Sequence, residues 1–308
     1  NNAVPTTPVV ITPDTAFGIP WRGAMVYINV NLNDLERKIT KINLTDTAPL
    51  FSQKTLFRLN ANTTNKRYSY FGMDAGIGNT TKDFWLFGGT GDFSALGDKS
   101  DGMDNILYGI RDREYPFFVP SQVPLQSSDN FVSAAHADAD AAKSIDDATH
   151  CSDVSLDDTG DACPDAEDAW VYHLDPITLP TTNLGTTAGT QDQDTVPNSG
   201  FRKASAPPTL FKGQVYFPVY EPPAGQNVCN IGNAFICVHD DECGTDNSHK
   251  LVKGREASVQ TCTFVREGVL SELVIFGDKL FANVAGPSEN AETLYSILSV
   301  PGEILSNK

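Results

Sequence analysis

The sequence has few basic residues and no long apolar run. Lys and Arg number 22 against 39 Asp and Glu in 308 residues, so the formal net charge is −17. So acidic a chain offers phosphate groups no basic surface, which argues against nucleic acid or anionic lipid as a partner. No stretch of 18 consecutive apolar residues occurs, and the sequence therefore predicts no membrane-spanning helix.

Recognisable catalytic patterns are also missing. The five histidines form no H-E-x-x-H pair, and neither G-x-S-x-G nor S-x-x-K occurs. Acidic residues are plentiful, but nothing singles out two of them as the paired carboxylates of a glycosidase. The sequence therefore favours a protein that is not an enzyme.

The six cysteines include no C-x-x-C pair. Four cysteines could bind zinc, but the spacing of a zinc site is absent, and the even count favours disulfides. Disulfides in turn indicate a location outside the cytoplasm. The sequence leaves the pairing open, and the pairs that we favour are Cys151–Cys163, Cys229–Cys243 and Cys237–Cys262. The last of these would join two neighbouring strands.

Short apolar runs separated by turn residues fill most of the chain. The runs are rich in Val, Ile, Tyr, Phe and Thr, and clusters of Gly, Asn, Asp and Pro divide them, which is typical of an all-β protein. They span residues 24–32, 38–44, 55–59, 67–73, 83–87, 105–110, 169–174, 214–220, 234–238, 259–265, 269–276, 279–284 and 293–300. We expect a β-domain over residues 23–308, preceded by an extended N-terminal leader over residues 1–22.

One segment differs from the rest of the domain. Residues 131–168 form an acidic insertion, and its Ala-rich part at 132–148 contains neither Pro nor Gly. This composition predicts one short surface helix, although the segment has almost no apolar stripe.

A pattern of an aliphatic residue, Tyr, any residue and an apolar residue recurs along the chain. Its tyrosines are Tyr27, Tyr108, Tyr172, Tyr216 and Tyr295. Most of the gaps lie near one or two multiples of about 40 residues, a period typical of β-propeller blades. Chance recurrence in a β-protein is the alternative explanation, and a pair of packed sheets in a β-sandwich is the alternative architecture.

The acidic insertion contains a candidate calcium loop. Eleven carboxylates and a single Lys lie between Asp138 and Asp168, and so dense a run either stays solvated or binds a hard cation. Residues 157–165 match D-x-T-x-D-x-x-x-D, in which alternate oxygen ligands point inward. The candidate ligands are Asp157, Thr159, Asp161, Asp165 and Asp168. Three further acids at a spacing of three, Asp98, Asp101 and Asp104, either cap a turn or bind an ion.

Four segments occur in an order that is characteristic of one family. They are Trp85-Leu86-Phe87-Gly88-Gly89-Thr90-Gly91, Leu107-Tyr108-Gly109-Ile110-Arg111-Asp112, Ala169-Trp170-Val171-Tyr172-His173-Leu174, and Pro207 to Phe217 followed by Cys229. This ordered set resembles the C-terminal β-propeller domain of the PilC/PilY family of type IV pilus tip adhesins. The resemblance covers about residues 23–300.

The resemblance implies a β-propeller, incomplete or modified, in a protein exported through the periplasm to the cell surface. It also implies a place at the pilus tip, with minor pilins and a host or abiotic surface as partners, and calcium as a cofactor. The calcium element usual for the family near the start of a blade is absent, and residues 157–165 are the nearest match. The alternatives are a secreted propeller enzyme, either a hydrolase or a dehydrogenase, and a generic calcium-binding cell-surface module.

Overall fold

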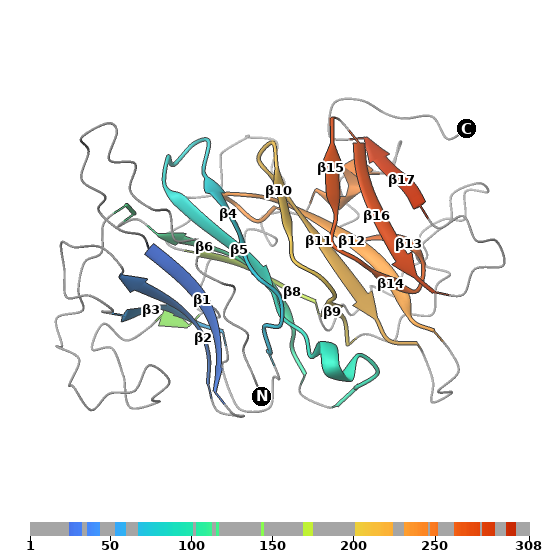
Figure 1. Cartoon of the computed structure of the whole chain (residues 1–308), viewed down its shortest axis with the longest axis horizontal. Coiled ribbons are helices and arrows are strands. Elements are labelled where there is room, and N and C mark those ends of the chain that lie inside the picture. Colours follow the sequence, from blue (N-terminus) through green and yellow to red (C-terminus); the bar gives the residue numbers. More distant parts are fainter. Residues whose placement is uncertain are drawn as a thin grey trace, which may run out of the picture.

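The computed structural model of the chain is all-β (Figure 1). It describes residues 25–32, 36–43, 53–59, 67–100, 103–112, 115–116, 143–144, 169–174, 201–223, 231–245, 247–251, 262–277, 279–286 and 294–299. Two short 3-10 turns, η2 (Phe93–Ala95) and η6 (Ser248–Leu251), are the sole helical elements in these ranges. The leader predicted over residues 1–22 lies outside them. Among the described elements, none is a helix long and apolar enough to cross a membrane.

The strands form four sheets, which we number I to IV along the chain. Sheet I has the order β1 (Met25–Leu32), β2 (Glu36–Asn43), β3 (Gln53–Arg58), β7 (Lys143–Ser144), and sheet II the order β4 (Asp74–Ile77), β5 (Phe84–Gly89), β6 (Ile106–Asp112), β8 (Ala169–His173). Sheet III has the order β10 (Thr209–Phe211), β11 (Gln214–Glu221), β12 (Asn233–Asp240), β13 (Thr263–Glu267), and β9 (Lys203–Ala204) also pairs with β11. In sheet IV, β16 (Lys279–Ala285) pairs with β14 (Val269–Leu270), β15 (Val274–Phe276) and β17 (Leu294–Ser299). All pairs are antiparallel except that of β3 with β7.

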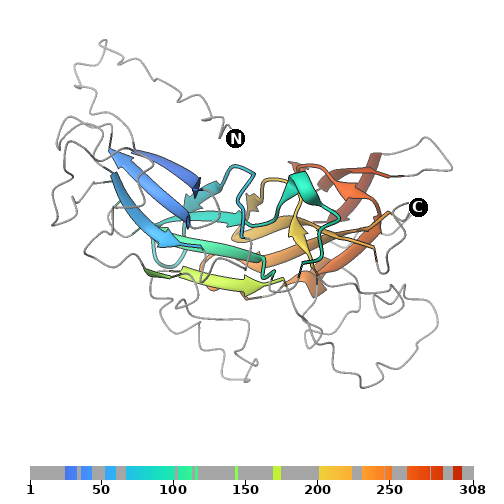
Figure 2. The ribbon, with the colours of Figure 1, turned by 90° about the horizontal axis from the view of Figure 1, so that it is seen from below.

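The sheets stack face to face in the order of the chain, as Figures 1 and 2 show from two directions. One apolar cluster lies between each sheet and the next: Ile39 and Ile110 belong to the first, Trp85 and Phe217 to the second, and Ile236 to the third. The strands in the middle of the stack are buried on both faces and read as nearly continuous apolar runs, whereas β16 alternates between buried and exposed residues. The described strands do not close into a barrel or a complete propeller ring.

Two glycines in sheet II make room for large rings on the neighbouring strand. Gly88 on β5 is the cross-strand partner of Tyr108, and Gly109 on β6 is the partner of Trp170. A Cβ at either glycine would overlap the facing ring, and the Trp170 indole also covers Gly244, whose φ is +69°. Cross-strand pairs of this kind stabilise a sheet through side-chain packing. Both rings are consequently buried.

A buried ion pair joins sheets I and II. Lys41 Nζ lies 2.7 Å from Asp112 Oδ2, and the Tyr27 hydroxyl donates to the same oxygen at 2.6 Å. The Lys41 and Asp112 side chains are essentially inaccessible to solvent, so each charge needs the other. The pair therefore fixes the position of β2 against the end of β6.

The helix predicted over residues 132–148 is wrong at the two residues of that segment that the structure describes. Lys143 and Ser144 form β7, which pairs in parallel with Phe57 and Arg58 of β3. A helix without an apolar stripe gains little from tertiary packing. Pairing with the outer strand of sheet I instead satisfies the backbone at this point.

Candidate functional site

The calcium ligands that the sequence predicts lie outside the described residues. These are Asp157, Thr159, Asp161, Asp165 and Asp168, and Cys151, Cys163 and Cys229 lie outside as well. Within the described part of the chain, no three His, Cys, Asp or Glu side chains are grouped so as to hold a metal ion. The calcium loop and two of the disulfides therefore remain predictions.

The third predicted disulfide is present. Cys237 on β12 and Cys262, the residue before β13, are bonded, and their Cα atoms are 4.2 Å apart. The register pairs Ile236 with Thr263, so the bond joins two directly opposed positions on neighbouring strands. Both cysteines belong to the apolar cluster between sheets II and III.

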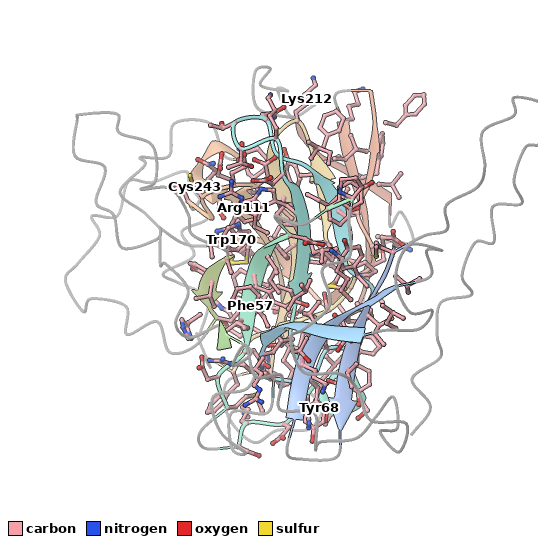
Figure 3. The ribbon with its side chains drawn as sticks, turned by 90° about the vertical axis from the view of Figure 1, so that its left-hand side faces the viewer. Phe57, Tyr68, Arg111, Trp170, Lys212 and Cys243 are labelled. Atoms are coloured by element: carbon pink, nitrogen blue, oxygen red, sulfur yellow. A yellow bond between two sulfur atoms is a disulfide. The ribbon has the colours of Figure 1, made fainter. Side chains whose placement is uncertain are left out.

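Sheets II and III have polar contacts at both ends, and Figure 3 labels Tyr68 near one end of the molecule and Lys212 near the other. We call the end that carries residues 90–105 the loop end. The end that carries the turns at residues 78–83 and 241–244 is the turn end. The two ends differ in the backbone groups that accept or donate hydrogen bonds there, and in the charge of the side chain that bonds to them.

At the loop end, Asp104 connects a buried arginine to a partly exposed histidine. Arg67 donates to the Asp104 carboxylate, to the Asp104 backbone oxygen at 2.7 Å and to the Leu59 backbone oxygen at 2.7 Å. His173 Nδ1 lies 2.8 Å from Asp104 Oδ1. Burial acts to raise the pKa of Asp104, but the hydrogen bond with His173 and the charge of Arg67 lower it below its usual value. The carboxylate is therefore ionised at neutral pH.

A histidine oriented by an aspartate is one part of a nucleophilic triad. Catalysis also needs a nucleophile within hydrogen-bond reach of the other imidazole nitrogen. Arg67 already neutralises the charge of Asp104, and it also donates to the Leu59 backbone oxygen. The network therefore anchors these chain segments to one another. The spacing of three singles out Asp104 in the sequence, but no pattern links it to Arg67 and His173, which are 37 and 69 positions away.

Lys203 closes the loop end with a buried ammonium group. Its Nζ donates to the backbone oxygens of Asp98 at 2.6 Å and Leu96 at 3.0 Å, and the residue is inaccessible to solvent. Of the three acids at a spacing of three, Asp98 accepts from Ser100 Oγ, Asp104 takes part in the network above, and Asp101 lies outside the described residues. Backbone oxygens that a cation could bind are thus occupied by an ammonium from the protein itself.

At the turn end the roles are reversed, because a carboxylate accepts from backbone N–H groups. Thr80 N donates to Glu242 Oε2 at 2.7 Å, and Thr81 N donates to Glu242 Oε1 at 2.6 Å. The Trp170 indole donates to the Asp241 backbone oxygen at 3.0 Å. These contacts tie the turn after β12 in sheet III to the turn before β5 and to β8 in sheet II.

Two neighbouring acids of this turn have opposite pKa shifts. Burial, together with the nearby charges of Asp240 and Glu242, raises the pKa of Asp241 to about 6. Burial also acts to raise the pKa of Glu242, but the hydrogen bonds from Thr81 and Thr80 lower it overall. The turn end therefore holds one acid that titrates near pH 6 beside one that stays ionised.

A row of aromatic side chains crosses the surface of the loop end. We call Tyr68, Tyr70, Phe71 and Phe93, together with Asp92 and Ser94, the aromatic strip. Phe71 and Phe93 meet edge to face with ring centroids 5.1 Å apart, and the centroids of Tyr68 and Tyr70 are 6.3 Å apart. Tyr70 and Phe93 are 49% and 40% exposed. Solvent therefore reaches large ring surfaces at this end.

The strand predicted over residues 67–73 is absent, since the described residues 67–73 have no regular structure. Side chains hold this segment instead: Asn29 Nδ2 donates to the Phe71 backbone oxygen, and Asn31 bonds both to the Ser69 backbone oxygen and to its N–H group. The aromatic residues of this segment predicted a strand. The same residues are the sequence signal that could have indicated an exposed aromatic surface.

Comparisons with known proteins find a similarity in structure but none in sequence. No protein-family model matches it, and no curated protein is similar to it in sequence. Among solved structures it is similar to the crystal structure of the Pseudomonas aeruginosa PilY1 C-terminal domain, with 11% identity and a TM-score of 0.45. The similarity covers 91% of this chain and 58% of that one. It is a distant likeness from which we infer no function.

Proposed function

We propose that the chain is a non-enzymatic extracellular adhesin and assembly factor at the tip of a type IV pilus. The observation that carries the proposal is the order of the four segments that resemble the pilus tip family. They lie on β5, β6, β8 and the β10–β11 hairpin, which are adjacent strands of sheets II and III. The partners of the protein would be minor pilins and a host or abiotic surface.

The arrangement of the sheets supports a propeller, incomplete or modified, as the architecture. Sheets I to IV follow one another along the chain, each consists mainly of antiparallel neighbours, and each packs its face on the next. Radial repetition of four-stranded sheets is how a propeller is built. The glycine and aromatic residues of the resembling segments also form the packed pairs of sheet II.

Two further features agree with a place outside the cytoplasm. The Cys237–Cys262 disulfide is of the kind that persists in oxidising compartments. The acidic loop at residues 157–165 has the oxygen-ligand pattern of a calcium site and immediately precedes β8. Calcium would then modulate the protein by ordering the approach to that strand.

The test combines localisation and loss of function in the source cell. Antibodies against the chain should label the ends of isolated pili, and deletion of its gene should reduce the number of surface pili. Reintroduced wild-type protein should restore them, whereas protein with both Cys237 and Cys262 replaced by Ser should not. Normal piliation in the deletion strain, with no label on pili, would overturn the proposal.

A further inference from the structure

The aromatic strip combines partly exposed aromatic side chains with hydrogen-bonding groups. The Tyr70 hydroxyl donates to Ser94 Oγ at 3.3 Å, and Ser94 Oγ donates to Asp92 Oδ1 at 2.6 Å. A chain of polar atoms thus runs beside the exposed rings of Tyr70 and Phe93. Apolar surface with a few fixed polar groups is the usual composition of a site for a small molecule.

The strip is held in place before any ligand binds. Asp92 accepts from Ser94 N at 2.9 Å and caps η2, which carries Phe93. The Gly91 N–H donates to the Tyr68 backbone oxygen at 2.7 Å, and the Arg37 guanidinium lies 4.0 Å from the centroid of the Tyr68 ring. A surface ordered in advance binds its ligand without the cost of ordering it.

The size of the strip favours a small ligand over a protein. It offers two well-exposed rings and a few polar groups, whereas a specific protein interface uses roughly 20–30 residues on each side. A sugar ring has an apolar face of C–H groups that can stack on an aromatic ring, and a rim of hydroxyls. Those hydroxyls can bond to the carboxylate of Asp92 and the hydroxyls of Ser94 and Tyr70.

Charge narrows the class of sugar further. The carboxylate of Asp92 lies within the strip, the Arg37 guanidinium against the Tyr68 ring is almost inaccessible to solvent, and the whole chain carries a formal charge of −17. Sialylated and sulfated sugars are anionic and would be repelled. We infer that the aromatic strip is a binding site for neutral carbohydrate, with Tyr70 and Phe93 as the stacking residues and Asp92 as the hydroxyl acceptor.

The inference deepens the proposed adhesin role, on which it rests, by naming the class of surface ligand. The experiment uses the full chain on a printed array of hexose-, N-acetylhexosamine-, sialic acid- and sulfate-terminated oligosaccharides. Each sugar that binds the protein on the array is then titrated in free form by saturation-transfer-difference NMR. Phe93→Ala removes one ring, and Tyr70→Phe removes one hydroxyl and keeps the ring. Phe276→Ala, at an even more exposed phenylalanine on β15, is the matched control.

We expect at least one neutral sugar to bind, with affinity reduced at least tenfold by Phe93→Ala, about threefold by Tyr70→Phe and not at all by Phe276→Ala. Binding of no sugar, binding of anionic sugars alone, or equal binding by the wild type and Phe93→Ala would overturn the inference. Because Phe93 is 40% exposed and lies outside the apolar clusters between the sheets, its loss should leave the fold intact, which the melting temperature verifies. Piliation in the deletion strain is measured independently, so failure of sugar binding is distinguishable from failure of the pilus proposal.

Discussion

At both ends of sheets II and III a charged side chain bonds to backbone groups of the neighbouring loop or turn. The charge is positive at the loop end and negative at the turn end. At the loop end, the ammonium of Lys203 donates to the backbone oxygens of Leu96 and Asp98, which follow η2. At the turn end, the carboxylate of Glu242 accepts from the N–H groups of Thr80 and Thr81. Glu242 lies beside two further acids, Asp240 and Asp241. Because the pKa of Asp241 is raised to about 6, the stability of the turn end should depend on pH in that range.

The largest effect is expected from Lys203→Met, which keeps most of the aliphatic stem but removes the ammonium. The backbone oxygens of Leu96 and Asp98 would then be left unsatisfied, at a cost of about 2–3 kcal/mol in the free energy of unfolding. Urea denaturation at pH 7 measures the loss. Lys279→Met on the exposed side of β16 is the control and should change stability by less than about 0.5 kcal/mol. Equal effects of the two substitutions would mean that the ammonium stabilises nothing.

We expect calcium to stabilise the turn end more than the loop end, because the predicted calcium loop precedes β8 and the first residue of β8 lies toward the turn end. Saturable binding at a hundredfold excess over Kd would raise stability by about 2.7 kcal/mol. Calorimetric titration, with thermal melts in EGTA, measures both quantities. Asp161→Ala should abolish the binding, whereas Asp153→Ala, in the same acidic run but outside the pattern, should preserve it. Binding that survives Asp161→Ala would place the ion elsewhere.

Glu242→Gln should cost about 1 kcal/mol at pH 7, because the amide keeps one acceptor but loses the charge that strengthens both bonds. The pKa of Glu242 is lowered in the folded chain, so the stability it contributes is complete above its unfolded pKa. That contribution is lost as the pH falls through the folded pKa. The difference between variant and wild type should therefore shrink on acidification. Glu272→Gln, at an exposed acid, serves as the control.

Asp241→Asn should have the opposite sign and the smallest size. The pKa of Asp241 is raised to about 6, so the wild type loses stability as the pH rises from about 4 to 6. The variant lacks this group and should be more stable than the wild type by up to about 1 kcal/mol above pH 6, with the advantage gone near pH 4. Denaturation midpoints across this range test it. A difference that does not vary with pH would show that Asp241 does not titrate there.

Much of the fold could be predicted from the sequence, because the strands carry continuous or alternating apolar patterns. The run at residues 214–220 became β11, and that at 169–174 contains β8. The run at 269–276 is instead broken into β14 and β15, whose registers with β16 differ by one residue. The apolar pattern of a sequence predicts well which residues are buried, but it predicts poorly where a strand is interrupted.

The candidate site was much less predictable. The contact of Glu242 with Thr80 spans 162 positions, and that of Lys203 with Leu96 spans 107. No local spacing records such pairs, because the stacking of whole sheets brings them together. The Cys237–Cys262 pair could be chosen because the two residues belong to the successive apolar runs at 234–238 and 259–265, which predict neighbouring strands. Asn29, which anchors the aromatic strip through the Phe71 backbone, has no signal of its own.

The pairing of glycine with a large ring in sheet II has an evolutionary consequence. A methyl group at Gly109 would occupy the place of the Trp170 indole, and one at Gly244 would meet the same ring. A lineage that acquires alanine at position 109 must therefore also acquire a smaller side chain at position 170, or lose the packing between sheets II and III. Substitutions at positions 109, 170 and 244 should consequently covary among homologues, and those at 88 and 108 should form a second, separate covarying pair.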